Sequence, residues 1–198
     1  MWSSNSKRFN EAFGLYKKEI VNIRTKESVG LSDDLDSIAK VQDNHGPNVP
    51  VIIAEREDKY KKRAERLTEK FLLKTEEIIF SSVDHIKSKE LSQIKKFIIE
   101  IFGGEIESIV QREEAISKAL SGKYNAGIVL GKIKLNYTMK KEDFLRELEL
   151  RAAKLNLLRK NERQKETKTQ FKNRMWDIVK MLLAGISGYL LRYFLEKK

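Results

Sequence analysis

Hydrophobic residues recur every three or four positions along most of this chain, which is the spacing of one face of an α-helix. In residues 4–24 the apolar side chains are separated by four, three, four and three positions, which predicts a first helix. We expect Gly30 to end this region and Ser32 to cap a short second helix, because serine favours helix N-termini. The apolar residues of the first stripe are Phe9, Phe13, Tyr16, Ile20 and Ile23.

Both prolines of the chain lie in residues 44–50. Proline interrupts a continuous helix, so this segment is predicted to be a linker. Residues 51–102 contain neither glycine nor proline and are rich in Lys, Glu, Leu and Ile, which favours a long helix. Its apolar pattern loosens near Ser81-Ser82, where we expect a break or a kink.

Glycines punctuate the second half of the chain. We interpret the glycine pair at 103–104 as the C-terminal stop of the long helix, with a further helix near 105–120. Apolar and polar residues alternate towards the end of 124–138, which favours a small β-hairpin with its turn near Gly131. An irregular helix–helix connection is the alternative for this segment. Thr138 then indicates the N-terminal cap of a last long helix.

These patterns together predict an all-α protein of elongated, antiparallel long helices in a coiled-coil-like arrangement, with an apolar helix at the C-terminus. We expect oligomerisation, because long amphipathic helices bury their apolar stripes most easily against other helices. The chain is divided into an N-terminal helical segment (1–45), a long helix, short helix and connection (51–138), a basic helix or spacer (139–174) and a C-terminal membrane-associated helix (175–198).

The net charge of the chain is concentrated near its C-terminus. The 198 residues include 40 Lys and Arg against 29 Asp and Glu, a formal net charge of +11. Residues 140–198 contain 16 basic and 8 acidic side chains, so eight of the eleven units lie there. Residues 57–69 also look basic, but acidic side chains interleave with Arg63, Arg66 and their neighbours. We interpret that stretch as a solvated helix face with i,i+4 ion pairs.

Residues that carry common chemistries are scarce. The chain has no Cys, which excludes disulfides, thiolate metal sites and cysteine nucleophiles, and its two His argue against a histidine metal site. The run from Gly127 to Lys132 departs from a phosphate-binding loop, which needs four residues between its glycines and Ser or Thr after the Lys. We therefore expect no enzymatic activity, no cofactor, no metal and no small-molecule substrate.

The most apolar part of the chain is 175–195, with a charge-free run of 11 residues from Met181 to Leu191. That run alone is short for a membrane span, but Lys180 and Arg192 flank it and long basic side chains can reach outward to the headgroups. Aromatic residues at its ends are typical of membrane interfaces. The predicted membrane-insertion residues are Trp176, Lys180, Leu182, Leu183, Ile186, Tyr189, Leu190, Arg192, Tyr193 and Phe194.

Two neighbouring features favour membrane contact. Ala184, Gly185 and Gly188 are small, and small residues allow helices to approach closely in a bilayer, so we predict helix association there. The preceding residues form a polybasic flank, which anionic lipid attracts, and positive charge favours the cytoplasmic side. The flank consists of Arg159, Lys160, Arg163, Lys165, Lys168, Lys172 and Arg174.

The sequence thus predicts a non-enzymatic helical scaffold or effector, attached to the cytoplasmic face of a membrane by its last helix. Within that class, oligomerisation is expected to perturb the membrane. One alternative is a soluble, cytoplasmic adaptor subunit whose C-terminal helix docks on a partner protein. A second alternative is a basic helical protein associated with nucleic acid, bound through phosphate contacts. Spanning the bilayer, lying on it and docking on protein all stay open for the last helix.

Overall fold

The computed structural model describes residues 2–45, 49–119 and 126–196. Side chains are described within these ranges except at 2–4, 32–45, 49–50, 52, 119, 128 and 184–196. The elements are α1 (Trp2–His45), α2 (Val49–Lys74), the π-helical turn η1 (Thr75–Phe80), α3 (Ser88–Ala119) and α4 (Ala126–Glu196). No β-strand occurs in the described residues, and the predicted all-α class is confirmed.

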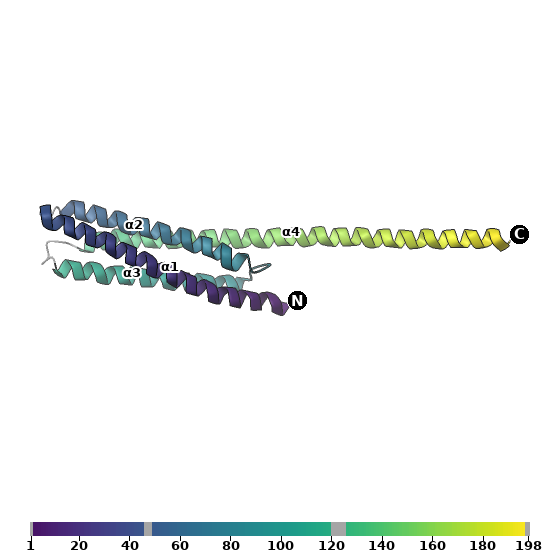
Figure 1. The fold of residues 1–198 in the computed structure, drawn as a ribbon, viewed down its shortest axis with the longest axis horizontal. Helices are drawn as coiled ribbons and strands as arrows, with labels where there is room; N and C mark the ends of the chain where they lie inside the picture. Colours follow the sequence, from purple (N-terminus) through teal and green to yellow (C-terminus); the bar gives the residue numbers. More distant parts are fainter. Residues whose placement is uncertain (1, 46–48, 120–125, 197–198) are drawn as a thin grey trace. The chain divides into compact units, whose positions relative to one another are not determined.

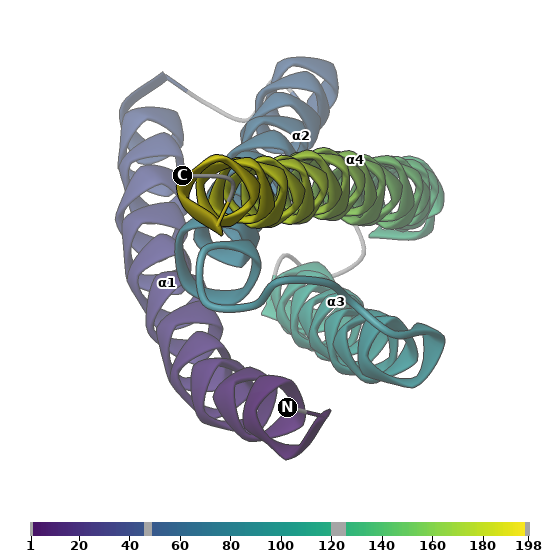
Figure 2. The same cartoon turned by 90° about the vertical axis from the view of Figure 1, so that its right-hand side faces the viewer.

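The chain divides into two compact units, and the boundary falls inside α4. The first unit, Met1–Leu155, contains α1, α2, η1, α3 and the first part of α4. The second unit, Asn156–Lys198, contains the rest of α4, through Glu196. Figures 1 and 2 show the helices of the first unit running alongside one another.

Contacts between named residues give the direction of each helix in the first unit. Helices α2 and α3 are antiparallel, because Arg56 pairs with Glu113 whereas Arg63, further along α2, pairs with the earlier residue Glu105. Helices α2 and α4 are parallel, because residues separated by the same 75 positions (132 minus 57, 140 minus 65, 151 minus 76) are paired. Helix α1 is antiparallel to α2, because Ser28 accepts from Arg63 whereas Tyr16, earlier in α1, accepts from the later residue Thr75. The first unit is therefore an up-and-down four-helix bundle. These parallel pairs are Glu57–Lys132, Glu65–Lys140 and, from η1, Glu76–Arg151.

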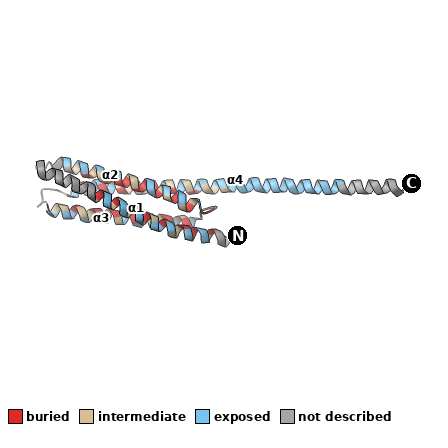
Figure 3. Cartoon of the chain, in the orientation of Figure 1, coloured by how far each residue is buried: buried red, intermediate tan, exposed pale blue. Residues whose placement is uncertain are grey.

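Large aromatic and aliphatic side chains form the core of this bundle. Figure 3 colours the buried residues red along its helices. Tyr16 of α1, Phe71 of α2 and Phe102 of α3 are each 1% exposed or less. The ring of Phe102 meets those of Phe71 and Tyr137 edge-on, at centroid distances of 6.0 and 6.4 Å. Burying side chains of this size stabilises the fold by about 1.5–3 kcal/mol each. The apolar stripe predicted for the first helix lies in this core. Its members Phe9, Tyr16 and Ile20 are buried, and Phe13 and Ile23 are partly buried.

Two predicted helix stops are wrong. Helix α1 continues through Gly30, and α3 continues through Gly103 and Gly104. A glycine inside a helix costs only about 1 kcal/mol relative to alanine, which is less than the burial of one large side chain returns. Leu31 and Phe102, which adjoin these glycines, are 0% and 1% exposed, so packing carries the helices through them.

The predicted hairpin at 124–138 is wrong where the structure describes it, because α4 begins at Ala126. Positions 124 and 125 lie outside the described residues. Val129, Ile133 and Tyr137 are buried at helical spacing, whereas Leu135, which a strand would place on their face, is 60% exposed. Thr138 accordingly lies inside α4 and does not cap its N-terminus.

The predicted break near Ser81-Ser82 is confirmed. The helix widens into η1 at Thr75–Phe80 and then ends, and the Ser81 amide donates to the Glu76 carbonyl five residues back, at 3.1 Å. Asn5 of α1 holds the connection to α3, since its side chain donates to the His85 carbonyl at 3.1 Å and accepts from the Asp84 amide at 3.0 Å. Helix α1 ends at His45 and α2 begins at Val49, so the predicted linker is wrong at 44–45 and 49–50, which are helical, and its residues 46–48 lie outside the described residues.

Candidate functional site

Several charged side chains lie inside the four-helix bundle, where an unpaired charge is costly. We call this set the polar seam. It is drawn from α1, α2, α3 and the first part of α4, and its residues are at most 9% exposed. Its members are Glu27, Arg56, Tyr60, Arg63, Glu105, Glu113 and Tyr137.

The first part of the polar seam centres on Glu113, which is 0% exposed. Arg56 donates to both carboxylate oxygens, with Nη2 at 2.5 Å from Oε1 and Nε at 3.3 Å from Oε2. The Tyr60 hydroxyl donates to the same Oε1 at 2.6 Å. Burial, together with the neighbouring carboxylate, raises the pKa of Tyr60 above its ordinary value. Tyr60 therefore remains a protonated donor, and the buried carboxylate is satisfied from two positions of α2.

The second part centres on Glu105, which receives an arginine from each of two helices. Arg63 Nη2 lies 2.5 Å from Oε2, and Arg24 of α1 donates to Oε1. Arg63 also donates to the Ser28 hydroxyl at 2.6 Å, so one guanidinium joins α1, α2 and α3. A methyl group on Gly104 would lie 3.2 Å from Arg24 Nη2, so this glycine leaves the space that Arg24 uses.

The third part is at Glu27 of α1, near the bundle surface. Lys70 Nζ lies 2.5 Å from Oε1 and Arg66 Nε lies 3.0 Å from Oε2. Burial by itself would raise the pKa of Glu27, but hydrogen bonds from Lys70 and Arg66 and their positive charges outweigh it and lower that pKa. Glu27 is therefore a stable anion that fixes α1 against α2 at neutral pH.

The polar seam specifies how the helices are aligned. A buried ion pair adds little stability over an apolar pair, but removing one partner costs about 3–5 kcal/mol. Sliding one helix past another would part several such pairs at once, so alternative alignments are penalised.

The hydroxyl of Tyr137 and Nε of Arg63 are buried without a hydrogen-bond partner.

The interpretation of residues 57–69 as a solvated face is wrong for Arg63, whose side chain is 3% exposed. The expected i,i+4 pair does occur between Asp58 and Lys62, at 2.7 Å. A signal for the polar seam was present in the sequence. Arg56 and Arg63 follow the apolar spacing of Tyr60 and Leu67, at steps of four, three and four. Charged residues in register with a buried stripe indicate buried ion pairs rather than a solvated face.

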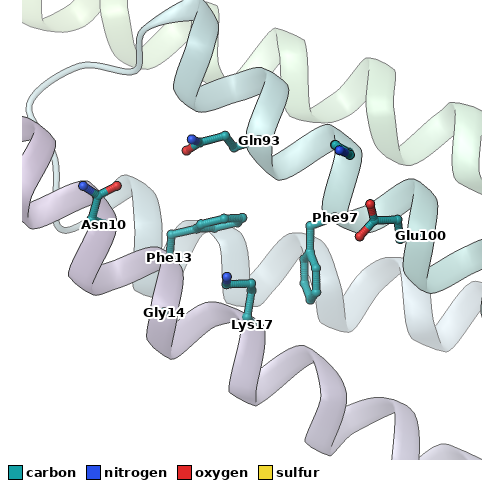
Figure 4. A pocket seen from close by; sticks show the side chains of 8 residues that line it. Asn10, Phe13, Gly14, Lys17, Gln93, Phe97 and Glu100 are labelled. Atoms are coloured by element: carbon teal, nitrogen blue, oxygen red, sulfur yellow. The ribbon is translucent and has the colours of Figure 1, made fainter.

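A groove of about 460 Å³ lies between α1 and α3 on the outside of the first unit (Figure 4). The rings of Phe13 and Phe97 meet edge-on at 6.0 Å in it, and Lys17 Nζ lies 4.9 Å from the centre of the Phe13 ring. Gly14 contributes no side chain, and nothing lies within 4 Å of the position its Cβ would take. The remaining lining is polar: Asn10, Gln93, Lys96 and Glu100.

Among the predicted membrane-insertion residues, those whose side chains the structure describes are exposed. Trp176 and Leu182 are each 62% exposed, Leu183 is 58% exposed and Lys180 is also exposed. Four further apolar residues that the prediction left out are exposed beside them: Phe171, Met175, Ile178 and Met181. The other predicted positions, whose side chains lie outside the described residues, are Ala184, Gly185, Ile186, Gly188, Tyr189, Leu190, Arg192, Tyr193 and Phe194.

The polybasic flank is a row of exposed cations on α4, except for Arg159, which is partly buried. Arg159 Nη1 pairs with Glu162 at 2.9 Å along the same helix. Over the residues that the structure describes, no helix contains a stretch both long and apolar enough to cross a membrane. The second unit thus presents exposed cations followed by exposed apolar side chains.

No protein-family model, curated protein or solved structure matches this chain.

Proposed function

We propose that this protein is a non-enzymatic helical scaffold or effector that attaches to the cytoplasmic face of a membrane through its C-terminal helix. One observation carries the proposal. Seven large apolar side chains within residues 171–183 are between 47% and 67% exposed. Proteins that work alone in water rarely expose such contiguous apolar surface, which is typical of membrane or protein contact. These residues are Phe171, Met175, Trp176, Ile178, Met181, Leu182 and Leu183.

Two further features support attachment through this end of the chain. The polybasic flank precedes the apolar residues, and such flanks are attracted to the anionic cytoplasmic leaflet. The first unit has its own core and polar seam. It can therefore stay folded as a scaffold while the C-terminal part of α4 attaches to the membrane. As finer parts of the proposal, the apolar helix continues through Leu191, the long helices pair in a coiled-coil-like way, and Ala184, Gly185 and Gly188 bring copies together to perturb the bilayer.

Fractionation of cells that express the full chain or a chain ending at Arg174 tests the proposal. We expect the full chain in the membrane pellet and the shortened chain in the supernatant, because shortening removes the exposed apolar residues after Phe171. A Leu15→Ser variant of the full chain is the matched control. It removes an apolar side chain that is 59% exposed on α1 and leaves α4 unchanged. Full and shortened chains that both remain soluble would refute membrane attachment.

The soluble adaptor is a second candidate, favoured by one specific spacing. Leu157, Phe171 and Ile178 are exposed and separated by multiples of seven positions, the repeat with which helices pair. A partner helix would cover this row. A full chain that leaves the membrane fraction only when a particular protein is co-expressed would favour the adaptor.

A further inference from the structure

The described apolar residues of the second unit lie mostly on one half of the helix. At about 100° per residue, Phe171, Ile178 and Leu182 fall within about 40° of one another when viewed down the axis. Met175, Val179, Leu183 and Trp176 extend this arc to about 160° in one direction. Lys172 is the charged residue inside the arc. The opposite half carries the polar residues Asn173, Arg174, Asp177 and Lys180, with Met181 among them.

Charge favours a helix lying in the plane of the membrane. Four charged side chains fall within residues 171–183, and charges are costly in the hydrocarbon core. A helix with one apolar half and one charged half buries the apolar half just below the headgroups and keeps its charges in water.

Charge also selects what covers the apolar half. Residues 156–183 contain eight basic and three acidic side chains, a net charge of five positive. A second copy of this segment would repel the first across the contact, whereas a surface of phosphate headgroups complements it. Exposed basic residues of this kind bind anionic lipid and not zwitterionic lipid.

We infer that residues 171–183 lie in the plane of a bilayer with their apolar half inserted, and that the polybasic flank selects anionic phospholipid as the surface. This inference rests on the proposed membrane attachment, to which it adds the lipid class and the orientation of the helix.

Vesicle flotation with the purified full chain tests the lipid class. One set of vesicles is phosphatidylcholine alone, and the other contains added phosphatidylglycerol. A Trp2→Phe background leaves Trp176 as the single tryptophan, so its fluorescence reports on insertion. We expect binding and a blue shift with phosphatidylglycerol and neither without it. Lys165→Gln and Lys168→Gln are each expected to weaken binding about fivefold at low salt.

A matched pair of variants tests the orientation. Leu182 and Met181 are similarly exposed, at 62% and 67%, but Leu182 lies within the apolar half and Met181 on the charged half. We expect Leu182→Ser to weaken binding at least tenfold and Met181→Ser to change it less than twofold. Both residues are exposed, so neither variant should alter folding, which thermal melting checks. Equal losses for the two variants would overturn the in-plane orientation.

The remaining outcomes separate the inference from the function it rests on. Equal binding to both kinds of vesicle would overturn selection of anionic lipid and leave membrane attachment standing. Binding to neither would refute both. Binding to duplex DNA with no binding to phosphatidylglycerol vesicles would assign the polybasic flank to nucleic acid and also refute the inference.

Discussion

Replacing Glu113 by leucine is expected to destabilise the first unit severely. The substitution removes the carboxylate that Arg56 and Tyr60 contact, while Arg56 remains 4% exposed. Breaking a buried pair from one side costs about 3–5 kcal/mol. With a urea m-value of about 2 kcal/mol/M, a loss of about 4 kcal/mol lowers the unfolding midpoint by about 2 M. Urea titration followed by far-UV circular dichroism measures this midpoint.

Two further variants decide whether the ion pair is the cause. Glu114 is the exposed neighbour of Glu113, and Glu114→Leu should stay within about 0.5 kcal/mol of the unchanged chain. The triple variant Arg56→Met, Tyr60→Phe and Glu113→Leu should recover most of the lost stability, because apolar groups replace the buried ion pair and also the Tyr60 hydroxyl that donates to Glu113. A triple variant no more stable than Glu113→Leu alone would refute this account of the polar seam.

Four other substitutions test particular contacts. Gly103→Ala should stabilise the unit by about 0.5–1 kcal/mol, because nothing lies within 4 Å of the added methyl group, and Gly104→Ala should gain less, because its methyl group would lie 3.2 Å from Arg24. Equal shifts of the two urea midpoints would contradict this. Tyr137→Phe should leave the midpoint unchanged or raise it, because the buried hydroxyl has no hydrogen-bond partner, and a large drop would argue against that geometry. The lowered pKa of Glu27 means that its contribution is complete above its ordinary pKa of 4.5 and is lost as pH falls through the folded value. The stability difference between the unchanged chain and Glu27→Gln should therefore shrink in acid, and a difference independent of pH would exclude this role.

The proposed attachment site depends on a feature visible in the sequence alone. Net charge and apolar composition along 159–183 identified the polybasic flank and the apolar stretch without any tertiary information. The predicted membrane-insertion set left out Phe171, Met175, Ile178 and Met181, which the structure shows to be exposed beside Trp176. Their spacing of three and four was present in the sequence, but only exposure shows that the row is uncovered in the folded chain.

The sequence by itself determined the helical class, the interruption around the two prolines and the break near Ser81. Each of these is local: a proline removes a backbone donor wherever it stands, and an apolar period of three to four residues needs only its own helix. Charge position is equally local, because it is read directly from residue order.

Only the tertiary structure decided where helices end and which charges are buried. Local helix propensity predicts that helices stop at Gly30 and Gly103. Burial of the flanking side chains outweighs the cost of a glycine inside a helix, which is about 1 kcal/mol. The segment at 126–138 fits both a strand and a helix locally, and packing of Val129 and Tyr137 in the bundle selects the helix. Arg63 is buried because Glu105, 42 positions further along the chain (105 minus 63), meets it across the bundle. Contacts over such separations exist only once the helices have packed, so their energies do not appear in any local pattern.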